Sequence, residues 1–416
     1  MTSERPRVAL LAGTLGRGGS EKQLVRLAAG LGAAGCQVAV WSLEAGGYYE
    51  APLRQLGLAV ESFGPGAIPV RLARLIWSLR GFRPHVIQSM HSYANLYAHL
   101  AARVLGGAVS VGALRGDWED MQRGNGRWAR PLLAWPDAVA VNSGRVLDEL
   151  VAHGVVERGQ GHYLANEIEV PEPRDSWAAS PAVPVLFAGR MIPGKRLDHF
   201  LEALALARAE EPALVGLIAG DGPVRAAMER RAAGLAPLNS PGAVTWLGQV
   251  DDMASLYRRA AILLFCSEHE GTPNAVIEAM AASLPVVTTP AGDAGRIVEH
   301  GVSGLVVEPG AVGQMKDALL ILARSAALRR QLGLAGRASV VARFGPGRLA
   351  GAAREIYEAA ARRAGQPAVL AVLRRMEAIV PERDCHGERG SPSEKYPAAI
   401  ERSAGPGDNR AWRGGK

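Results

Sequence analysis

The 416-residue chain has few cysteines and few aromatic residues, and it lacks long apolar runs. Its three cysteines, Cys36, Cys266 and Cys385, lie far apart without CxxC spacing, which argues against disulfides and zinc sites and fits a reducing cytosol. No segment approaches the roughly 20 apolar residues of a transmembrane helix. The first apolar run is short and interrupted by glycine, unlike a signal peptide. These absences predict a cytoplasmic protein, at most peripheral to the inner face of the membrane.

The chain also lacks an Asp-x-Asp motif and any long block of lysine and arginine. The first absence predicts that no metal is bound, and the second excludes a nucleic-acid partner. The net charge of +7 suits anionic ligands or an anionic membrane, or is a scattered excess. The segment VRLARLIWSLRGFRP (70–84) has the pattern of a basic amphipathic helix, which would either lie on anionic lipid or pack on its own sheet.

Short apolar runs alternate with helical patterns through most of the chain, and this alternation predicts parallel sheets. The runs are mostly apolar rather than alternating, as expected of strands buried on both faces. The first half has runs at 7–15, 37–43, 58–63, 85–90, 108–114 and 137–143. The second half has runs at 184–189, 213–220, 243–248, 261–266, 285–289 and 304–307.

We therefore predict an α/β protein with two Rossmann-like, doubly wound parallel-sheet domains that face a cleft. Ligands of such sheets bind at the carboxyl ends of the strands. The expected organisation is an N-terminal Rossmann-like domain (1–168), a Pro- and Ser-rich linker (169–183), a C-terminal Rossmann-like domain (184–342), a C-terminal helix (343–363) and a mostly disordered tail (364–416). A short helix at 367–380 is expected to precede that tail.

A glycine loop, GTLGRGGSEKQL (13–24), follows the first strand. Gly16, Gly18 and Gly19 would let the backbone turn sharply and approach a ligand closely. The third glycine of a dinucleotide fingerprint would fall at Glu21, so NAD binding is disfavoured. We expect the loop to face the cleft next to the phosphate or the acceptor of a substrate, and the alternative is a tight turn without a ligand.

Two cations flank a Pro-Gly turn in FAGRMIPGKRLDHF (187–200). Arg190 and Lys195 follow a predicted strand, so both would lie at its carboxyl end. There they suit a diphosphate, because arginine gives planar two-point contact and lysine a compact charge. The alternative is two exposed basic residues in a loop.

A helix start follows the strand at 261–266, in EHEGTPNAVIEAM (268–280). Thr272 is expected as the N-cap and Pro273 as the first helical residue. Asn274 and Ala275 would then present free N–H groups at the positive end of the helix dipole. This arrangement predicts a second anion site.

Two glutamates bracket that site. Glu278 lies one helical turn after Asn274, where a carboxylate can accept two hydroxyls of a ribose. Glu270 precedes the helix, on the side where a sugar attached to the diphosphate would lie. The spacing suits a nucleoside-diphosphate-sugar, and the alternative is two solvated helix-end charges.

The stretch 268–310 closely resembles the donor-binding segment of the retaining GT-B glycosyltransferases of family 4. FAGRMIPGKRLD, LIAGDGP (217–223) and VTWLGQVDDMASLY (244–257) resemble that family in the expected order. The resemblance covers roughly residues 7–360. It implies that the N-terminal domain lies on the acceptor side, that the C-terminal domain binds the nucleotide sugar, and that the helix at 343–363 crosses back to the N-terminal domain. It implies a metal-independent hexosyltransferase that needs no cofactor and moves a sugar, with retention, from a UDP- or GDP-linked donor to a hydroxyl acceptor, expected to be a glycan or a lipid-linked molecule.

The resemblance also implies roles for single residues. Arg190 and Lys195 would hold the diphosphate together with the backbone of Thr272, Asn274 and Ala275. Glu278 would hold the ribose, while Glu270 would bind the hydroxyls of the sugar as a catalytic residue. Two further assignments are His91, close to the sugar, and the region of Gln249 and Val250, near the base.

One segment departs from the family pattern, in which Pro-Asn-Gly precedes the second domain. Here the sequence reads HYLANEIEV (162–170), so Asn166 is kept without the proline and the glycine. A non-catalytic nucleotide-sugar-binding protein therefore remains an alternative. A nucleotide-sugar epimerase or a phosphorylase, each built on a similar two-domain frame, would also fit the pattern of strands and helices.

Overall fold

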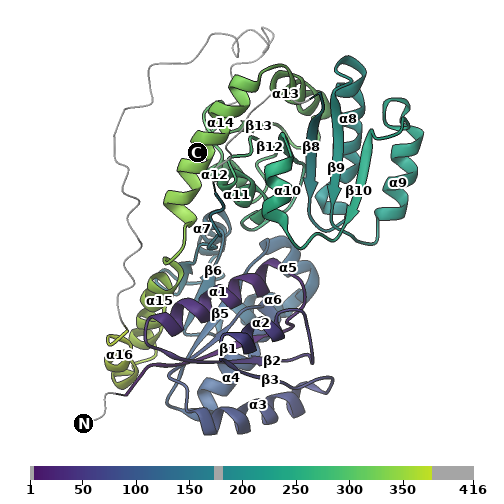
Figure 1. The fold of residues 1–416 in the computed structure, drawn as a ribbon. Helices are drawn as coiled ribbons and strands as arrows, with labels where there is room; N and C mark the ends of the chain where they lie inside the picture. Colours follow the sequence, from purple (N-terminus) through teal and green to yellow (C-terminus); the bar gives the residue numbers. More distant parts are fainter. Residues whose placement is uncertain (1–3, 173–180, 377–416) are drawn as a thin grey trace. The chain divides into compact units, whose positions relative to one another are not determined.

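The computed structural model describes residues 4–172 and 181–376. Within these residues the chain forms two parallel β-sheets, each covered by helices on both faces (Figure 1). This architecture confirms the predicted fold of two doubly wound α/β domains.

The first sheet has the strand order β3-β2-β1-β4-β5-β6-β7, and neighbouring strands are parallel. Every residue of β4, β5 and β6 is buried, as the apolar runs indicated. The short β7 was not predicted, because its sequence GHY is not an apolar run. The strands are β1 (Arg7–Ala12), β2 (Gln37–Ser42), β3 (Ala59–Ser62), β4 (Val86–Ser89), β5 (Val109–Leu114), β6 (Ala138–Val141) and β7 (Gly161–Tyr163).

The two faces of this sheet carry different helices. Val8 and Leu10 of β1 pack against one layer, and Ala9 and Leu11 against the other, because side chains alternate along a strand. The first layer holds α1 (Gly19–Ala33), α2 (Glu50–Gln55), α15 (Leu349–Arg363) and α16 (Pro367–Leu373). The opposite layer holds α3 (Ile68–Phe82), α4 (Asn95–Leu105), α5 (Trp118–Asn125), α6 (Ala129–Ala134) and α7 (Gly144–Ala152).

The second sheet has the order β10-β9-β8-β11-β12-β13, and it too is parallel. Its strands are β8 (Val183–Ala188), β9 (Leu214–Ala219), β10 (Val244–Gly248), β11 (Ile262–Phe265), β12 (Val286–Thr288) and β13 (Leu305–Val306). Its helices are α8 (Leu197–Glu210), α9 (Arg225–Gly234), α10 (Met253–Arg259), α11 (Asn274–Ala281), α12 (Ala294–Ile297), α13 (Val312–Arg324) and α14 (Ala326–Phe344). Short 3-10 helices are η1 (Ser92–Ala94), η2 (Gly126–Trp128), η3 (Pro193–Lys195) and η4 (Ala236–Leu238).

The last described helices connect the two sheets. Helix α14 packs on α11, whereas α15 contacts α1, β5 and β6 of the first sheet. The two helices are separated by a turn at Gly345–Pro346–Gly347, where Gly347 has a φ of 82°. In α15, Tyr357 is fully buried, and its hydroxyl donates a hydrogen bond to Gln88 of β4.

Two predicted segments lie partly outside the described residues. Of the linker at 169–183, residues 173–180 lie outside, and β8 begins at Val183. Of the tail, residues 377–416 lie outside, while α16 occupies the start of the predicted helix 367–380. Within the described parts of the chain, no helix has the length and apolar character needed to cross a membrane.

Candidate donor and acceptor site

A cleft of about 790 Å³ contains residues from both halves of the chain. Two of the residues predicted for the site, Gly16 and His91, do not line it. The predicted residues that do line it are Gly18, Gly19, Arg190, Lys195, Gln249, Val250, Glu270, Thr272, Asn274, Ala275 and Glu278. The cleft thus brings together most of a site that the sequence distributes over 260 positions.

The two cations predicted to hold the diphosphate follow β8. Arg190 is exposed and makes no hydrogen bond or ion pair with another residue that the structure describes. Lys195 closes η3, and its Nζ donates to Glu270 Oε1. Because an ammonium group carries three N–H donors, this bond leaves two donors for a second anion.

The helix after β11 begins one residue later than predicted. Helix α11 starts at Asn274, with Pro273 as its N-cap residue, and the Thr272 side chain caps nothing. The predicted N-cap role of Thr272 is therefore wrong. Its buried hydroxyl lies against the Asn142 carbonyl oxygen and 3.1 Å from Asp293 Oδ2, so tertiary contacts override the local capping preference.

Glu278 is held by two residues before any ligand binds. Lys22 of α1 donates from Nζ to Glu278 Oε1 at 2.7 Å, and the Tyr257 hydroxyl lies 3.2 Å from Oε2. Burial and the neighbouring carboxylate raise the pKa of Tyr257 well above its usual value, so the phenol stays a donor. These two contacts orient the carboxylate in the cleft.

The glycine loop needs glycine for space rather than for backbone conformation. None of Gly16, Gly18 and Gly19 has a positive φ, so the loop does not use the left-handed conformations that favour glycine. A Cβ atom at Gly19 would lie 2.5 Å from Asn274 Nδ2 of α11. A Cβ atom at Gly18 would meet the Glu21 carboxylate. The loop therefore permits a close approach between the halves of the chain.

His91 lies behind this loop. The Gly13 backbone N–H donates to His91 Nδ1 at 3.0 Å, so a neutral ring carries its proton on Nε2. That Nε2 lies 3.4 Å from Glu21 Oε1. Glu21 is buried, and its sequence position had suggested only a broken dinucleotide fingerprint.

Asn166, the residue kept from the Pro-Asn-Gly pattern, connects three elements. Its Nδ2 donates to Asn274 Oδ1 at 2.7 Å, and its Oδ1 accepts from Arg115 Nη1 at 3.0 Å. Burial lowers the pKa of Arg115 to about 10. Arg115 lines the cleft without an ion pair to any described residue, so it adds a cation that sequence reasoning missed.

Asp293 joins the two halves of the chain beside the cleft. It follows β12, and its buried carboxylate accepts from Ser143 Oγ, Gly144 N and Arg145 N at 2.8, 2.9 and 3.0 Å. A side chain of the second half thus caps α7 of the first half. Nothing in the local sequence indicates this pairing.

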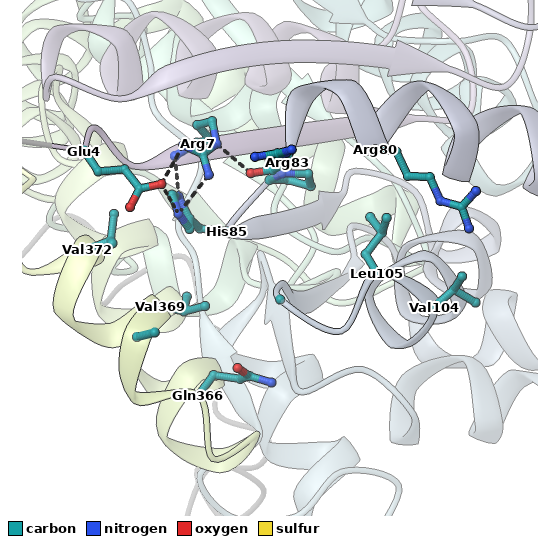
Figure 2. Close-up of a pocket in the computed structure, with 13 residues that line it drawn as sticks. Glu4, Arg7, Arg80, Arg83, His85, Val104, Leu105, Gln366, Val369 and Val372 are labelled. Atoms are coloured by element: carbon teal, nitrogen blue, oxygen red, sulfur yellow. Dashed lines mark hydrogen bonds and ion pairs between the residues drawn. The ribbon is translucent and has the colours of Figure 1, made fainter.

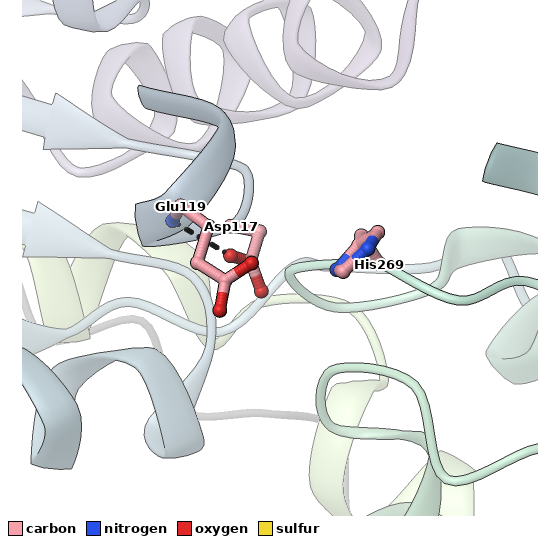
Figure 3. Close-up of side chains that lie close together, drawn as sticks. All are labelled: Asp117, Glu119 and His269. Carbon is pink, nitrogen blue, oxygen red and sulfur yellow. Dashed lines mark hydrogen bonds between the residues drawn. The ribbon is translucent and has the colours of Figure 1, made fainter. Parts of the chain in front are cut away.

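Asp117, Glu119 and His269 offer ligand atoms that all lie within 4.8 Å of one another (Figure 3). The Asp117 carboxylate already accepts from the backbone N–H of Glu119 and from Arg145 Nη2. Capping of α5 and this ion pair account for the position of Asp117. The absence of a metal from the reaction stays a prediction.

Two family profiles match the chain, one in each half. Residues 17–166 match "Glycosyltransferase Family 4", and residues 183–325 match "Glycosyl transferases group 1". The first match includes strands β2 to β7, and the second includes strands β8 to β13. They support the resemblance that the sequence motifs indicated.

Several known proteins have sequences similar to that of this chain. A GDP-mannose-dependent alpha-mannosyltransferase of Mycolicibacterium smegmatis is 29% identical over 301 residues, which are 66% of this chain and 73% of that protein. Exopolysaccharide phosphotransferase SCO2592 of Streptomyces coelicolor is 32% identical over 155 residues, which are 36% of this chain and 16% of that protein. Several further matches cover at most 41% of the curated relatives.

The crystal structure of Anabaena Alr3699/HepE with UDP and glucose has a TM-score of 0.73 and 19% identity, and the match covers 84% of this chain and 98% of that one. At this identity the likeness concerns the fold. This likeness shows a GT-B fold, and the two family profiles support a glycosyltransferase built on it.

Proposed function

We propose that the protein transfers a sugar from a nucleoside-diphosphate donor to a hydroxyl acceptor and retains the anomeric configuration. The observation that carries this proposal is the cleft itself. Two cations, a helix N-terminus and two glutamates line one volume that a nucleotide sugar would fill. The proposed enzyme is a hexosyltransferase of the retaining family 4 type.

The proposed chemistry is electrostatic stabilisation of the leaving group. Negative charge develops on the nucleoside diphosphate as the bond to the sugar breaks. Arg190, Lys195 and the first N–H groups of α11 would stabilise this charge without a metal or a cofactor. Arg115, from the first half of the chain, is a further cation within the same cleft.

The remaining groups would orient the donor. Glu278, already held by Lys22 and Tyr257, would accept the ribose hydroxyls, and the region of Gln249 and Val250 would lie near the base. Glu270 would bind the sugar. UDP or GDP is the proposed nucleotide, because HepE was solved with UDP-glucose and the mycobacterial relative is named GDP-mannose-dependent.

His91 is proposed to act near the sugar. Its ring is held behind the glycine loop by the hydrogen bond from the Gly13 backbone. The acceptor would enter from the side of the first sheet, where Gly18 and Gly19 line the cleft. We propose a glycan or a lipid-linked molecule as the acceptor. A lipid-linked acceptor would bring the enzyme to the inner face of a membrane.

The test is turnover of UDP-, GDP- and ADP-linked sugars by the purified protein, read as release of free nucleoside diphosphate. The anomeric configuration of the product is then determined by NMR. We expect one nucleotide class to be consumed and the configuration to be kept. Binding without release for every donor would instead favour a non-catalytic nucleotide-sugar-binding protein, and an inverted product would contradict retention.

A further inference from the structure

The helical layer of α3, α4 and α6 exposes large apolar side chains. Trp77 on α3 is 76% exposed, Val104 on α4 is 57% exposed, and Trp128, directly before α6, is 51% exposed. This layer and its adjoining residues carry half of the strongly exposed large apolar residues among the described parts of the chain: Ile68, Val70, Trp77, Val104, Trp128 and Trp135. Such a concentration on one layer differs from singly scattered surface residues, which need no explanation.

The same layer is basic. Segments 68–84, 95–107 and 126–135 contain arginines and no aspartate or glutamate. Arg74, Arg80 and Arg83 form no ion pair with any residue that the structure describes. Arg127 lies over the Trp128 ring at 5.6 Å from its centroid. Exposed tryptophan beside uncompensated arginine is the composition of surfaces that contact anionic lipid.

This layer ends at a pocket of about 530 Å³, between the ends of α3 and α4 and the helix α16 (Figure 2). Arg7, Arg80 and Arg83 line its basic side, while Val104 and Val369 belong to its apolar wall. Glu4, the acidic residue that lines this pocket, pairs with Arg7 at 2.9 Å. The charges of Arg80 and Arg83 therefore stay uncompensated. The pocket therefore combines positive charge with an apolar wall.

His85 adds no charge to this pocket. Its Nδ1 accepts the backbone N–H of Arg7 at 3.0 Å, which leaves the ring proton on Nε2. Burial, and then the charge of Arg7, lower the pKa of His85. Arg83 has a φ of 52°, and its carbonyl accepts from Arg7 Nε at 2.6 Å. An arginine here occupies a left-handed helix end that glycine usually takes.

We infer that this face docks on an anionic lipid bilayer and that the pocket binds the phosphate of a lipid headgroup. The tryptophans would lie at the level of the headgroups, Arg74 would contact neighbouring phosphates, and Arg80 and Arg83 would bind the phosphate that enters the pocket. The inference rests on the proposed function only in that it places a lipid-linked acceptor beside the enzyme.

The experiment is co-sedimentation of the full chain, without donor, with vesicles of phosphatidylcholine alone or mixed with phosphatidylglycerol, at low and at physiological salt. We expect binding to the mixed vesicles only, weakened by salt. Trp77→Ser and the double variant Arg80→Ala/Arg83→Ala should each reduce partitioning about tenfold or more. Leu206→Ser and Arg330→Ala, exposed residues of the second half, serve as matched controls and should bind like the wild type.

The inference would be overturned if the wild type did not bind anionic vesicles. It would also be overturned if the Trp77→Ser and Arg80→Ala/Arg83→Ala variants bound them as strongly as the wild type. Thermal stabilisation by inorganic phosphate that requires Arg80 and Arg83, without vesicle binding, would show a site for a free anion and would also overturn docking. Because no arm contains a sugar donor, failure of the proposed transfer reaction leaves this result intact. Circular dichroism of each variant verifies that the exposed substitutions leave the fold unchanged.

Discussion

Lys22 Nζ lies 2.7 Å from Glu278 Oε1, and this ion pair connects α1 of the first half with α11 of the second. Both side chains are partly buried, with 35% and 17% of their surfaces exposed. The pair orients the carboxylate that we propose for the ribose. It also contributes to holding the cleft together in the absence of a donor.

The pair should show energetic coupling in a double-mutant cycle of Lys22→Met and Glu278→Gln. We expect a coupling free energy of about 1 kcal/mol, because a partly buried ion pair exceeds the usual surface value only modestly. Urea unfolding of the wild type, the two single variants and the double variant measures it. Additive effects of the two substitutions would contradict the pair.

Asp293→Ala should destabilise the protein by about 2–4 kcal/mol, because it removes the acceptor of three donors in the first half. Ser143 Oγ and the N–H groups of Gly144 and Arg145 would each lose the carboxylate that accepts their hydrogen bond. Urea unfolding measures the loss. Asp317→Ala, at an exposed residue of α13, is the control and should change stability by less than about 0.5 kcal/mol. Equal stability of the two variants would argue against a structural connection at Asp293.

Gly19→Ala should impair donor turnover, since the added methyl group would lie 2.5 Å from the Asn274 side chain at the start of α11. We expect turnover to fall about tenfold or more, the effect of displacing a binding group by roughly 1 Å. Gly32→Ala in the same helix has no atom within 4 Å of its new methyl group and is the matched control. A Gly19→Ala enzyme as active as the Gly32→Ala enzyme would show that the close approach is dispensable.

Three histidines should make the fold sensitive to acid. Burial is the largest cause that lowers the pKa of His85, His99 and His162 below the ordinary value. The folded state keeps them neutral, so the unfolded chain takes up more protons as the pH falls through about 6.5. Below that pH stability should fall, by up to about 1.4 kcal/mol per pH unit for each histidine, until the folded-state pKa is reached.

Denaturant unfolding across the range from about pH 7 to about pH 5 checks this sign. His99→Gln and His162→Gln should each flatten the slope, because each removes one proton from the difference between the two states. Stability that rises on acidification, or a slope unchanged in both variants, would contradict the assignment.

The sequence predicted the two sheets well, because strands buried on both faces appear as apolar runs. It missed β7, whose three residues are too few and too polar for such a run. Local patterns also predicted correctly that Arg190, Lys195, Glu270 and Glu278 lie in one cleft. Each of these residues follows a strand or a helix start, so its position depends mainly on neighbouring residues.

The partners of those residues could not be predicted in the same way. Lys22 meets Glu278 across 256 positions, and Ser143 meets Asp293 across 150. Such pairs depend on which helices and loops of the two halves of the chain meet, and no local pattern records this. Thr272 shows the same effect, because a good capping residue is used instead for contacts with Asn142 and Asp293.

The most direct test of the donor site is the affinity of the responsive nucleotide sugar for the wild type and for three variants, Glu278→Ala, Arg190→Ala and Lys195→Ala, by titration calorimetry. Each variant should bind at least about tenfold more weakly, the effect of losing one charge-assisted hydrogen bond. Glu308→Ala and Arg330→Ala, both exposed and outside the cleft, should bind like the wild type. Wild-type affinity in all three cleft variants would contradict the proposed donor site.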